Sequence, residues 1–209
     1  VSSLEQVDEE ESALATSWAS GPAMNAARAQ HTVTRLNDGR LLIAGGISGG
    51  SALASVDICD AAGTSCTAAA SMPNARYDHV AALLSNGKVL VAGGNSGSGS
   101  IAAADLFDPS TNQWSAVASM NKVRSNAAAA VLTDGKILVA GGVNANNSAV
   151  ATAELFDPQA GTWTITGAMS GPRKSHQAVL LSTGGKVLVA GGYYSGALAT
   201  AELYDPASG

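Results

Sequence analysis

The stretch GKVLVAGG occurs at residues 87–94 and again at 185–192. Two close copies complete the series, GRLLIAGG at 39–46 and GKILVAGG at 135–142. The last glycines of successive copies are separated by 48, 48 and 50 residues. A fixed period near 50 residues predicts an array of similar structural units.

Further positions repeat in step with the double glycine. An arginine precedes each copy, at Arg28, Arg76, Arg124 and Arg173. Three residues after these arginines come His31, His79, Ala127 and His176. Each copy is followed by two acidic residues three positions apart, at Asp57/Asp60, Asp105/Asp108, Glu154/Asp157 and Glu202/Asp205. In the two middle units a tryptophan then precedes a methionine by six positions, in Trp114/Met120 and Trp163/Met169.

Over residues 14–209 this set of motifs resembles the kelch repeat, with its Arg-x-x-His strand, apolar strand ending in Gly-Gly, acidic-x-Tyr-Asp-Pro strand and Trp strand. The resemblance implies an all-β fold, a β-propeller built from four-stranded blades. Kelch propellers usually have six or seven blades, whereas this chain holds four units.

The residues themselves support the same fold. Asn86–Gly87 separates two apolar runs, and Asn-Gly favours a tight hairpin because both positions accept positive φ. The runs are continuously apolar, which suits strands buried on both faces by neighbouring blades. We expect the pairs Phe107/Trp114 and Phe156/Trp163 to wedge between blades, where burial of each ring contributes roughly 2–3 kcal/mol.

The units predict blades at about residues 25–71, 72–120, 121–170 and 171–209. The last unit ends before its expected tryptophan, but Trp18 precedes Met24 by the same six positions. We therefore expect strand 14–20 to complete the last blade and to remove an exposed sheet edge. Three arrangements remain open: a closed four-bladed ring, a piece of a longer chain, and two chains sharing one larger ring. The small residues at 127–130, on an innermost strand, favour a small ring weakly.

Composition excludes several function classes. The formal charge is −5, and the acidic cluster within residues 1–13 predicts a flexible solvated tail, which leaves the body neutral. A neutral body without a basic patch argues against nucleic acid. No apolar run is long enough to span a membrane, and we expect no uncleaved signal peptide, with a cleaved one as the open alternative.

The first unit replaces the aromatic pair with Cys59 and Cys66, the only cysteines. Adjacent strands of one hairpin bring such positions close enough for a disulfide, with two buried thiols as the alternative. A disulfide implies an oxidising compartment, so we expect a secreted, cell-surface or periplasmic protein.

Strand direction places the variable loops after each Gly-Gly on one face, together with the segment that precedes each arginine. This arrangement predicts a binding face. On it Arg28, Arg76, Arg124 and Arg173 are candidate ligands for a carboxylate or sulfate, although their periodic acidic partners favour structural ion pairs. The recurring histidines indicate core hydrogen bonding, and their spacing matches no metal motif.

Other candidate ligand contacts lie on the variable loops. Tyr193 and Tyr194 offer platforms for sugar rings, and Asn95 and Asn146 offer hydrogen bonds to hydroxyls. Packing of the tyrosines against each other is the alternative.

The sequence favours a non-catalytic binding module for a glycan or protein, with no cofactor and no metal. A sugar oxidase or epimerase of the kelch type is the first alternative, but we find neither copper-ligating residues nor a free acid–base pair. A unit that assembles with its own copies through the open blade is the second.

Overall fold

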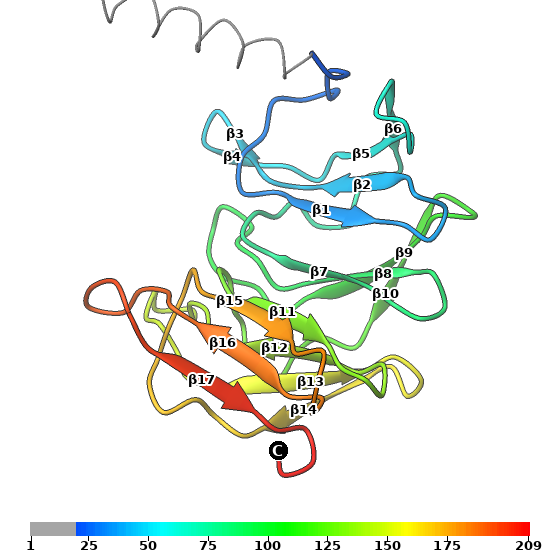
Figure 1. The fold of residues 1–209 in the computed structure, drawn as a ribbon. Coiled ribbons are helices and arrows are strands. Elements are labelled where there is room, and N and C mark those ends of the chain that lie inside the picture. The colour runs from blue at the N-terminus through cyan, green and yellow to red at the C-terminus, as the bar shows by residue number, and fades with distance from the viewer. Residues whose placement is uncertain (1–19) are drawn as a thin grey trace, which may run out of the picture.

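The computed structural model describes residues 20–209. These residues contain no helix and form four main sheets, which are arranged as the blades of a β-propeller (Figure 1). The predicted all-β, four-bladed propeller is therefore confirmed. The predicted tail at 1–13 and all but Ser20 of the predicted strand at 14–20 lie outside the described residues.

Each blade is an antiparallel sheet whose strands follow chain order. Blade 1 contains β1 (Thr32–Arg35), β2 (Leu41–Ala44), β5 (Val56–Cys59) and β6 (Cys66–Ala69). Blade 2 contains β7 (Val80–Leu83), β8 (Val89–Ala92), β9 (Ala104–Asp108) and β10 (Gln113–Val117). Blade 3 contains β11 (Ala128–Val131), β12 (Ile137–Ala140), β13 (Ala153–Asp157) and β14 (Thr162–Thr166). Blade 4 contains, within the described residues, β15 (Gln177–Leu180), β16 (Val187–Ala190) and β17 (Ala201–Tyr204).

The first two strands of each blade are joined by the turn that the sequence predicted. In blade 2 the turn residue Gly87 has φ +81°, a region that glycine enters without steric cost. Its amide donates to the Leu84 carbonyl at 2.9 Å, and the Lys88 amide donates to Asn86 Oδ1 at 3.0 Å. These local bonds set the register of β7 against β8.

The core lies between the blades, in three apolar clusters. Successive residues of β8 contribute to different clusters: Leu90 packs with Ile137 of blade 3, and Val91 packs with Leu42 of blade 1. The second strand of a blade is thus buried on both faces, which explains its unbroken apolar sequence. The third cluster joins blade 3 to blade 4 through Leu138 and Val189.

The double glycines bring consecutive blades into backbone contact. The amides of Gly46, Gly94 and Gly142 each donate at 2.9 Å to the carbonyl of the next blade's arginine. A Cβ on Gly93 would lie 2.4 Å from the Arg124 carbonyl oxygen, so no larger residue fits without displacing the neighbouring blade.

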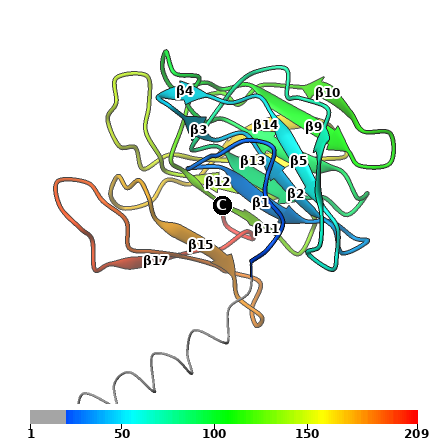
Figure 2. The same cartoon turned by 90° about the horizontal axis from the view of Figure 1, so that it is seen from above.

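Three such interfaces form, and the two end blades remain apart in the described chain. The inner strands β1, β7, β11 and β15 pack in that order, while β15 and β1 make no comparable contact within residues 20–209. Both views show β5 and β17 well apart (Figures 1 and 2). The end faces expose Val33 on blade 1 and Val179 and Leu203 on blade 4, each more than half accessible to solvent.

Candidate binding face

The loops that follow the four double glycines gather at one end of the blades, which we call the loop face. It comprises residues 45–55, 93–103, 141–152 and 191–200 and the residues between each arginine and its inner strand. Isolated bridges tie the start of each loop to the residue after the arginine, as in Tyr77 with Asn95 and Lys174 with Tyr193. The first loop forms a small hairpin of β3 (Ile47–Ser48) and β4 (Ser51–Ala52), which the sequence did not predict.

The four candidate arginines lie inside the blades rather than at the mouth of the propeller. They form the ion pairs that the periodicity indicated, Arg28–Asp57 (2.6 Å), Arg76–Asp105 (2.5 Å), Arg124–Glu154 (2.7 Å) and Arg173–Glu202 (2.7 Å). Their side chains are at most 3% exposed. A ligand role for these arginines stays a prediction. It would require each buried guanidinium to break its ion pair within the blade.

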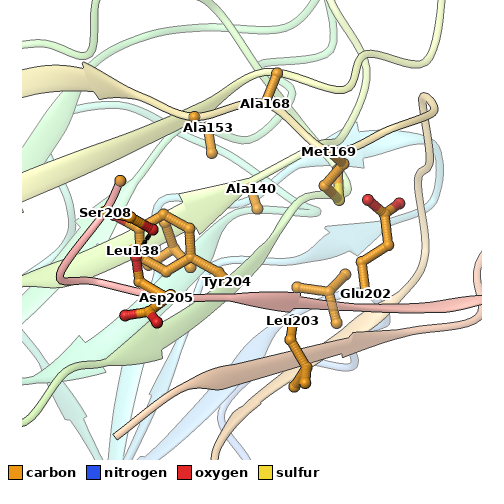
Figure 3. A pocket seen from close by; sticks show the side chains of 13 residues that line it. Leu138, Ala140, Ala153, Ala168, Met169, Glu202, Leu203, Tyr204, Asp205 and Ser208 are labelled. Carbon is orange, nitrogen blue, oxygen red and sulfur yellow. Dashed lines mark hydrogen bonds between the residues drawn. The ribbon is translucent and has the colours of Figure 1, made fainter.

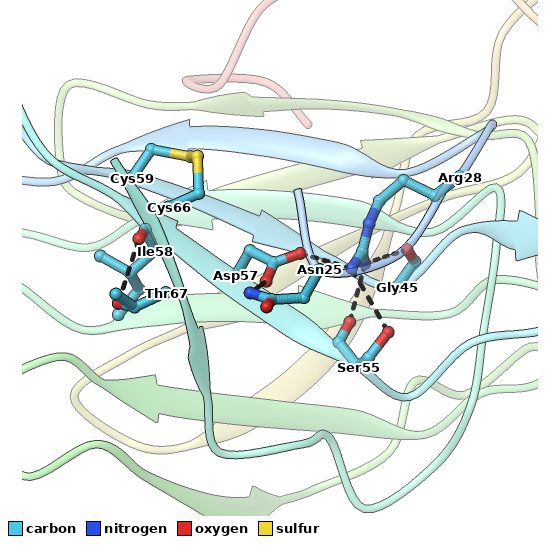
Figure 4. Close-up of polar contacts among 9 residues, drawn as sticks. All are labelled: Asn25, Arg28, Gly45, Ser55, Asp57, Ile58, Cys59, Cys66 and Thr67. Atoms are coloured by element: carbon cyan, nitrogen blue, oxygen red, sulfur yellow. Dashed lines mark hydrogen bonds and ion pairs between the residues drawn. A yellow bond between two sulfur atoms is a disulfide. The ribbon is translucent and has the colours of Figure 1, made fainter. Parts of the chain in front are cut away.

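Each guanidinium also satisfies backbone carbonyls of its own blade. Nη1 of Arg28 donates to the carbonyls of Gly45 and Ser55, at 2.8 and 2.9 Å, while Asn25 donates to the paired Asp57 (Figure 4). The arginine therefore fastens the start of the variable loop to the third strand of its blade.

Hydrogen bonding keeps two of the paired acids, Glu154 and Glu202, ionised. Burial alone would raise the pKa of Glu154, but hydrogen bonds from Arg124 and Asn121 outweigh it and hold the pKa below its ordinary value. The same balance holds the pKa of Glu202 below its ordinary value, through bonds from Ser170 and Arg173. These acids are thus committed to structure and are not available as general acids.

Two of the three histidines lie in interfaces between blades. His79 is buried, its Nε2 is 2.8 Å from Thr32 Oγ1 of blade 1, and burial lowers its pKa to about 3. His176 is also buried, and the loss of solvent lowers its pKa to about 4. Burial likewise lowers the pKa of His31, which is only partly covered. Within residues 20–209 no three His, Cys, Asp or Glu side chains converge to hold a metal ion.

The candidate loop residues all lie on the loop face but do not form one cluster. Tyr193 and Tyr194 are 47% and 55% exposed, and the Lys174 ammonium lies 5.8 Å from the Tyr193 ring centroid. Asn95 is half-buried, and its Oδ1 accepts a hydrogen bond from the Gly97 amide. Asn146 is exposed on the loop of blade 3. These residues come from three different blades, and their roles as ligand contacts stay predictions.

A set of four polar residues, which we call the polar arc, was not predicted from the sequence. Each stands two residues after the arginine of its unit, at Gln30, Asp78, Asn126 and Ser175. All four have φ between 52° and 57°. Their backbones form a ladder around the mouth, because the amides of Asp78, Asn126 and Ser175 donate to the preceding member's carbonyl at 3.0, 2.8 and 3.1 Å. The sequence does contain a signal for the polar arc, because the second residue after each arginine is polar in every unit.

A cavity lies beneath the polar arc, along the inner strands of blades 2, 3 and 4. Its volume is about 180 Å³, and it is lined by Val80, Ala81, Ala127–Ala129, His176, Gln177 and Ala178. Most of the lining residues are small, but the surface that they present to the cavity is mainly polar, so this cavity admits a narrow chain rather than a ring system.

A second cavity, of about 160 Å³, belongs to the packing of blades 3 and 4 (Figure 3). Tyr204 projects into it at the position that Phe107 and Phe156 hold in blades 2 and 3. There Trp114 and Trp163 cover the phenylalanines, with ring centroids 5.0 Å apart. The two indoles donate to carbonyls of the preceding blade. In the described residues no indole covers Tyr204.

The fold and these repeated contacts define a kelch-type β-propeller. The chain belongs to the kelch-repeat family, since the family described as KLHDC2/KLHL20/DRC7 Kelch-repeats domain matches residues 9–192. Members of this family typically act as binding and scaffold modules. No curated protein matches the chain. The described residues include no helix long and apolar enough to cross a membrane.

Proposed function

We propose that this protein is a protein-binding module that engages its ligand through the loop face. The observation that carries the proposal is the contrast between the blades and their loops. The blades repeat the same buried contacts, whereas the four loops read ISGGSALAS, NSGSGSIA, VNANNSAVA and YYSGALA. Rigid scaffolds with divergent loops are a general arrangement for recognition.

The chemistry of these loops supports a protein ligand. Serine and alanine are the commonest residues in these loops, and the serines, glycines, asparagines and tyrosines among them are residue types that are also enriched in antibody combining sites. Tyr193 and Tyr194 supply rigid amphipathic surface, and the serines and asparagines supply adaptable hydrogen bonds. Lys174 and Asp78 are the charged side chains at the mouth, so the face is nearly neutral.

The test is a ligand selected from a displayed protein library, followed by affinity measurements on variants. Replacing both Tyr193 and Tyr194 with alanine is expected to weaken binding at least tenfold, since exposed aromatics often dominate interface energies. Lys88→Ala, at the hairpin end of blade 2, is the matched control and is expected to leave affinity unchanged. A ligand sensitive to Lys88→Ala and indifferent to the tyrosines would contradict the proposal.

Two finer proposals accompany this one. A glycan is the alternative ligand, with Tyr193 stacking on a sugar ring and Asn95 and Asn146 bonding to its hydroxyls. Glycan-array binding that disappears in Tyr193→Ala would favour it over a protein. We also propose secretion or display at the cell surface, because the Cys59–Cys66 disulfide persists in oxidising compartments.

Self-assembly is a second candidate function, favoured by the exposed end faces. Val179 and Leu203 occupy positions that are covered by the next blade elsewhere in the chain, and the cavity beside Tyr204 matches the place of a tryptophan strand. Light scattering tests it: a mass of twice 20.6 kDa, lost in Leu203→Glu, would support assembly. A mass of 20.6 kDa at high concentration would argue against it.

A further inference from the structure

We propose that Asp78, at the mouth of the propeller, is a recognition site for a protonated amine or guanidinium, supplied by a lysine or arginine side chain of the protein that binds the loop face. This inference rests on the proposed function and names the chemistry of its central contact.

Asp78 differs from every other acid in the described chain. Residues 20–209 contain 11 acidic residues. Eight form ion pairs within the chain: Asp38, Asp57, Asp105, Asp108, Asp134, Glu154, Glu202 and Asp205. Asp60 and Asp157 accept hydrogen bonds from the backbone amides of their own turns. Asp78, in contrast, neither pairs with a cation of the described chain nor accepts hydrogen bonds from the backbone amides of a turn.

The hydrogen bonds that Asp78 does accept are long. Nε2 of Gln30 and Nδ2 of Asn126 both donate to Asp78 Oδ2, each at 3.4 Å. Hydrogen bonds between a cation and a carboxylate are usually about 2.7–2.9 Å long. Among the described residues none donates to Oδ1 of Asp78, so this oxygen is open to an external donor.

The surroundings of Asp78 favour a cation. The side chain is half-buried, and this loss of solvent raises the pKa of its carboxyl group. The nearest basic side chains are committed elsewhere: Arg76 pairs with Asp105, and Lys174 lies over the Tyr193 ring. His79, the next residue, is held neutral by burial near pH 7. A cation from outside would therefore meet no competing cation in this part of the chain.

Backbone and cavity geometry fix where such a group enters. The ladder of the polar arc holds Asp78 at φ 52°, between the amides of Gln30 and Asn126. The side-chain amide of Gln30 has a carbonyl oxygen that can accept N–H groups, and the one of Asn126, which already accepts from Ser175 Oγ at 3.1 Å, has a second lone pair. The axial cavity begins just below, lined by Val80 and Ala127–Ala129, which follow the polar arc by one to three residues. Its small lining residues leave room for the unbranched stem of lysine or arginine.

The experiment is an NMR titration of amide chemical shifts with Nα-acetyl-lysine methylamide at pH 7. The neutral analogue Nα-acetyl-norleucine methylamide is the ligand control. We expect millimolar binding of the lysine probe centred on the polar arc, at least tenfold weaker in Asp78→Asn. Asp38→Asn, at the opposite end of the blades, is expected to bind as the parent does. Equal binding of both probes, or no loss in Asp78→Asn, would overturn the proposal.

Asp78→Asn is expected to fold, because Asn126 holds the equivalent position of blade 3 at φ 57°. Failure of this inference is separable from failure of the proposed function. A selected protein ligand that is lost with Tyr193 and Tyr194 but unaffected by Asp78→Asn would leave the loop-face function standing and refute the amine site. A lysine probe that binds as described, with ligands that map only to the opposite face, would refute the function instead.

Discussion

The buried ion pairs show how one residue fastens a whole blade. Arg124 contacts Glu154 at 2.7 Å and also donates to the carbonyls of Gly141 and Thr152, each at 2.9 Å. Removing the cation leaves a carboxylate and two carbonyls in the interior. We expect Arg124→Met to lower the free energy of unfolding by about 3–5 kcal/mol, measured by urea denaturation.

Lys136→Met in the same blade is the matched control. Its partner Asp134 lies at 3.0 Å, but both side chains are 39% exposed or more, and surface pairs contribute at most about 1 kcal/mol. Similar losses in the two variants would show that burial does not set the strength of the arginine pairs.

Buried histidines predict sensitivity to mild acid. His79 has its pKa lowered to about 3 in the folded state, whereas an unfolded histidine titrates near 6.5. The unfolded chain therefore takes up a proton first, and stability present above pH 6.5 is lost as the pH falls. Between pH 7 and pH 5 we expect this residue to cost about 2 kcal/mol.

The measurement compares the parent with His79→Ala, a substitution that reproduces Ala127 of blade 3. The variant is less stable at pH 7, but its free energy of unfolding is expected to fall less between pH 7 and pH 5. An identical pH dependence in both proteins would refute the assignment of a neutral, buried imidazole.

Residue roles were predictable where they repeat with a charge partner. The pairing of Arg76 with Asp105 followed from their common period, because a periodic cation beside a periodic anion is most stable as a buried pair. The polar arc was harder to foresee. The left-handed backbone of Asp78 and Ser175 is held by interblade hydrogen bonds, which the sequence of a single unit does not reveal.

At the scale of strands, continuously apolar runs and turn chemistry were sufficient to predict most of the fold. The hairpin at Asn86–Gly87 and the doubly buried strand that follows it both matched expectation. The small hairpin of β3 and β4 was missed. Its strands have two residues each and show no apolar pattern. The hairpin forms because Gly49 and Gly50, both at positive φ, make the turn between the two strands.

The disulfide is the clearest prediction on one element, the hairpin of β5 and β6. Cys59 and Cys66 are register partners with Cα atoms 4.0 Å apart, and the predicted disulfide is confirmed. It takes the place of the aromatic pairs of blades 2 and 3. In the chain-entropy model a loop of about eight residues contributes roughly 2–3 kcal/mol.

Replacing both cysteines with serine is expected to lower the free energy of unfolding by about that amount. The parent in reductant should show a similar loss, which separates the bond from the serine side chains. Equal stability of the parent with and without reductant, with both thiols alkylated in the reduced sample, would contradict the prediction.

For the whole molecule, ring closure is a separate property from blade number. The period predicted the number of blades, but closure depends on contacts between the first and last units, which no repeat inside the chain reports. Gly191 shows the difference. It has φ +67°, nearly that of Gly93 at +66°, yet its nearest neighbour in place of a Cβ is the Leu198 carbonyl oxygen at 3.7 Å.

These two glycines form a matched pair of tests. Alanine at either position must adopt positive φ, which costs about 1–2 kcal/mol. Only Gly93→Ala also drives a methyl group into the Arg124 carbonyl of the next blade and against the Met120 side chain. We expect Gly93→Ala to be the more destabilising by about 2 kcal/mol in urea denaturation, since overpacking a rigid interface typically costs that much. Equal losses would mean that another blade also covers Gly191 in solution. An arginine carbonyl of that blade would lie against Gly191 as the Arg124 carbonyl lies against Gly93, and the propeller would then be closed.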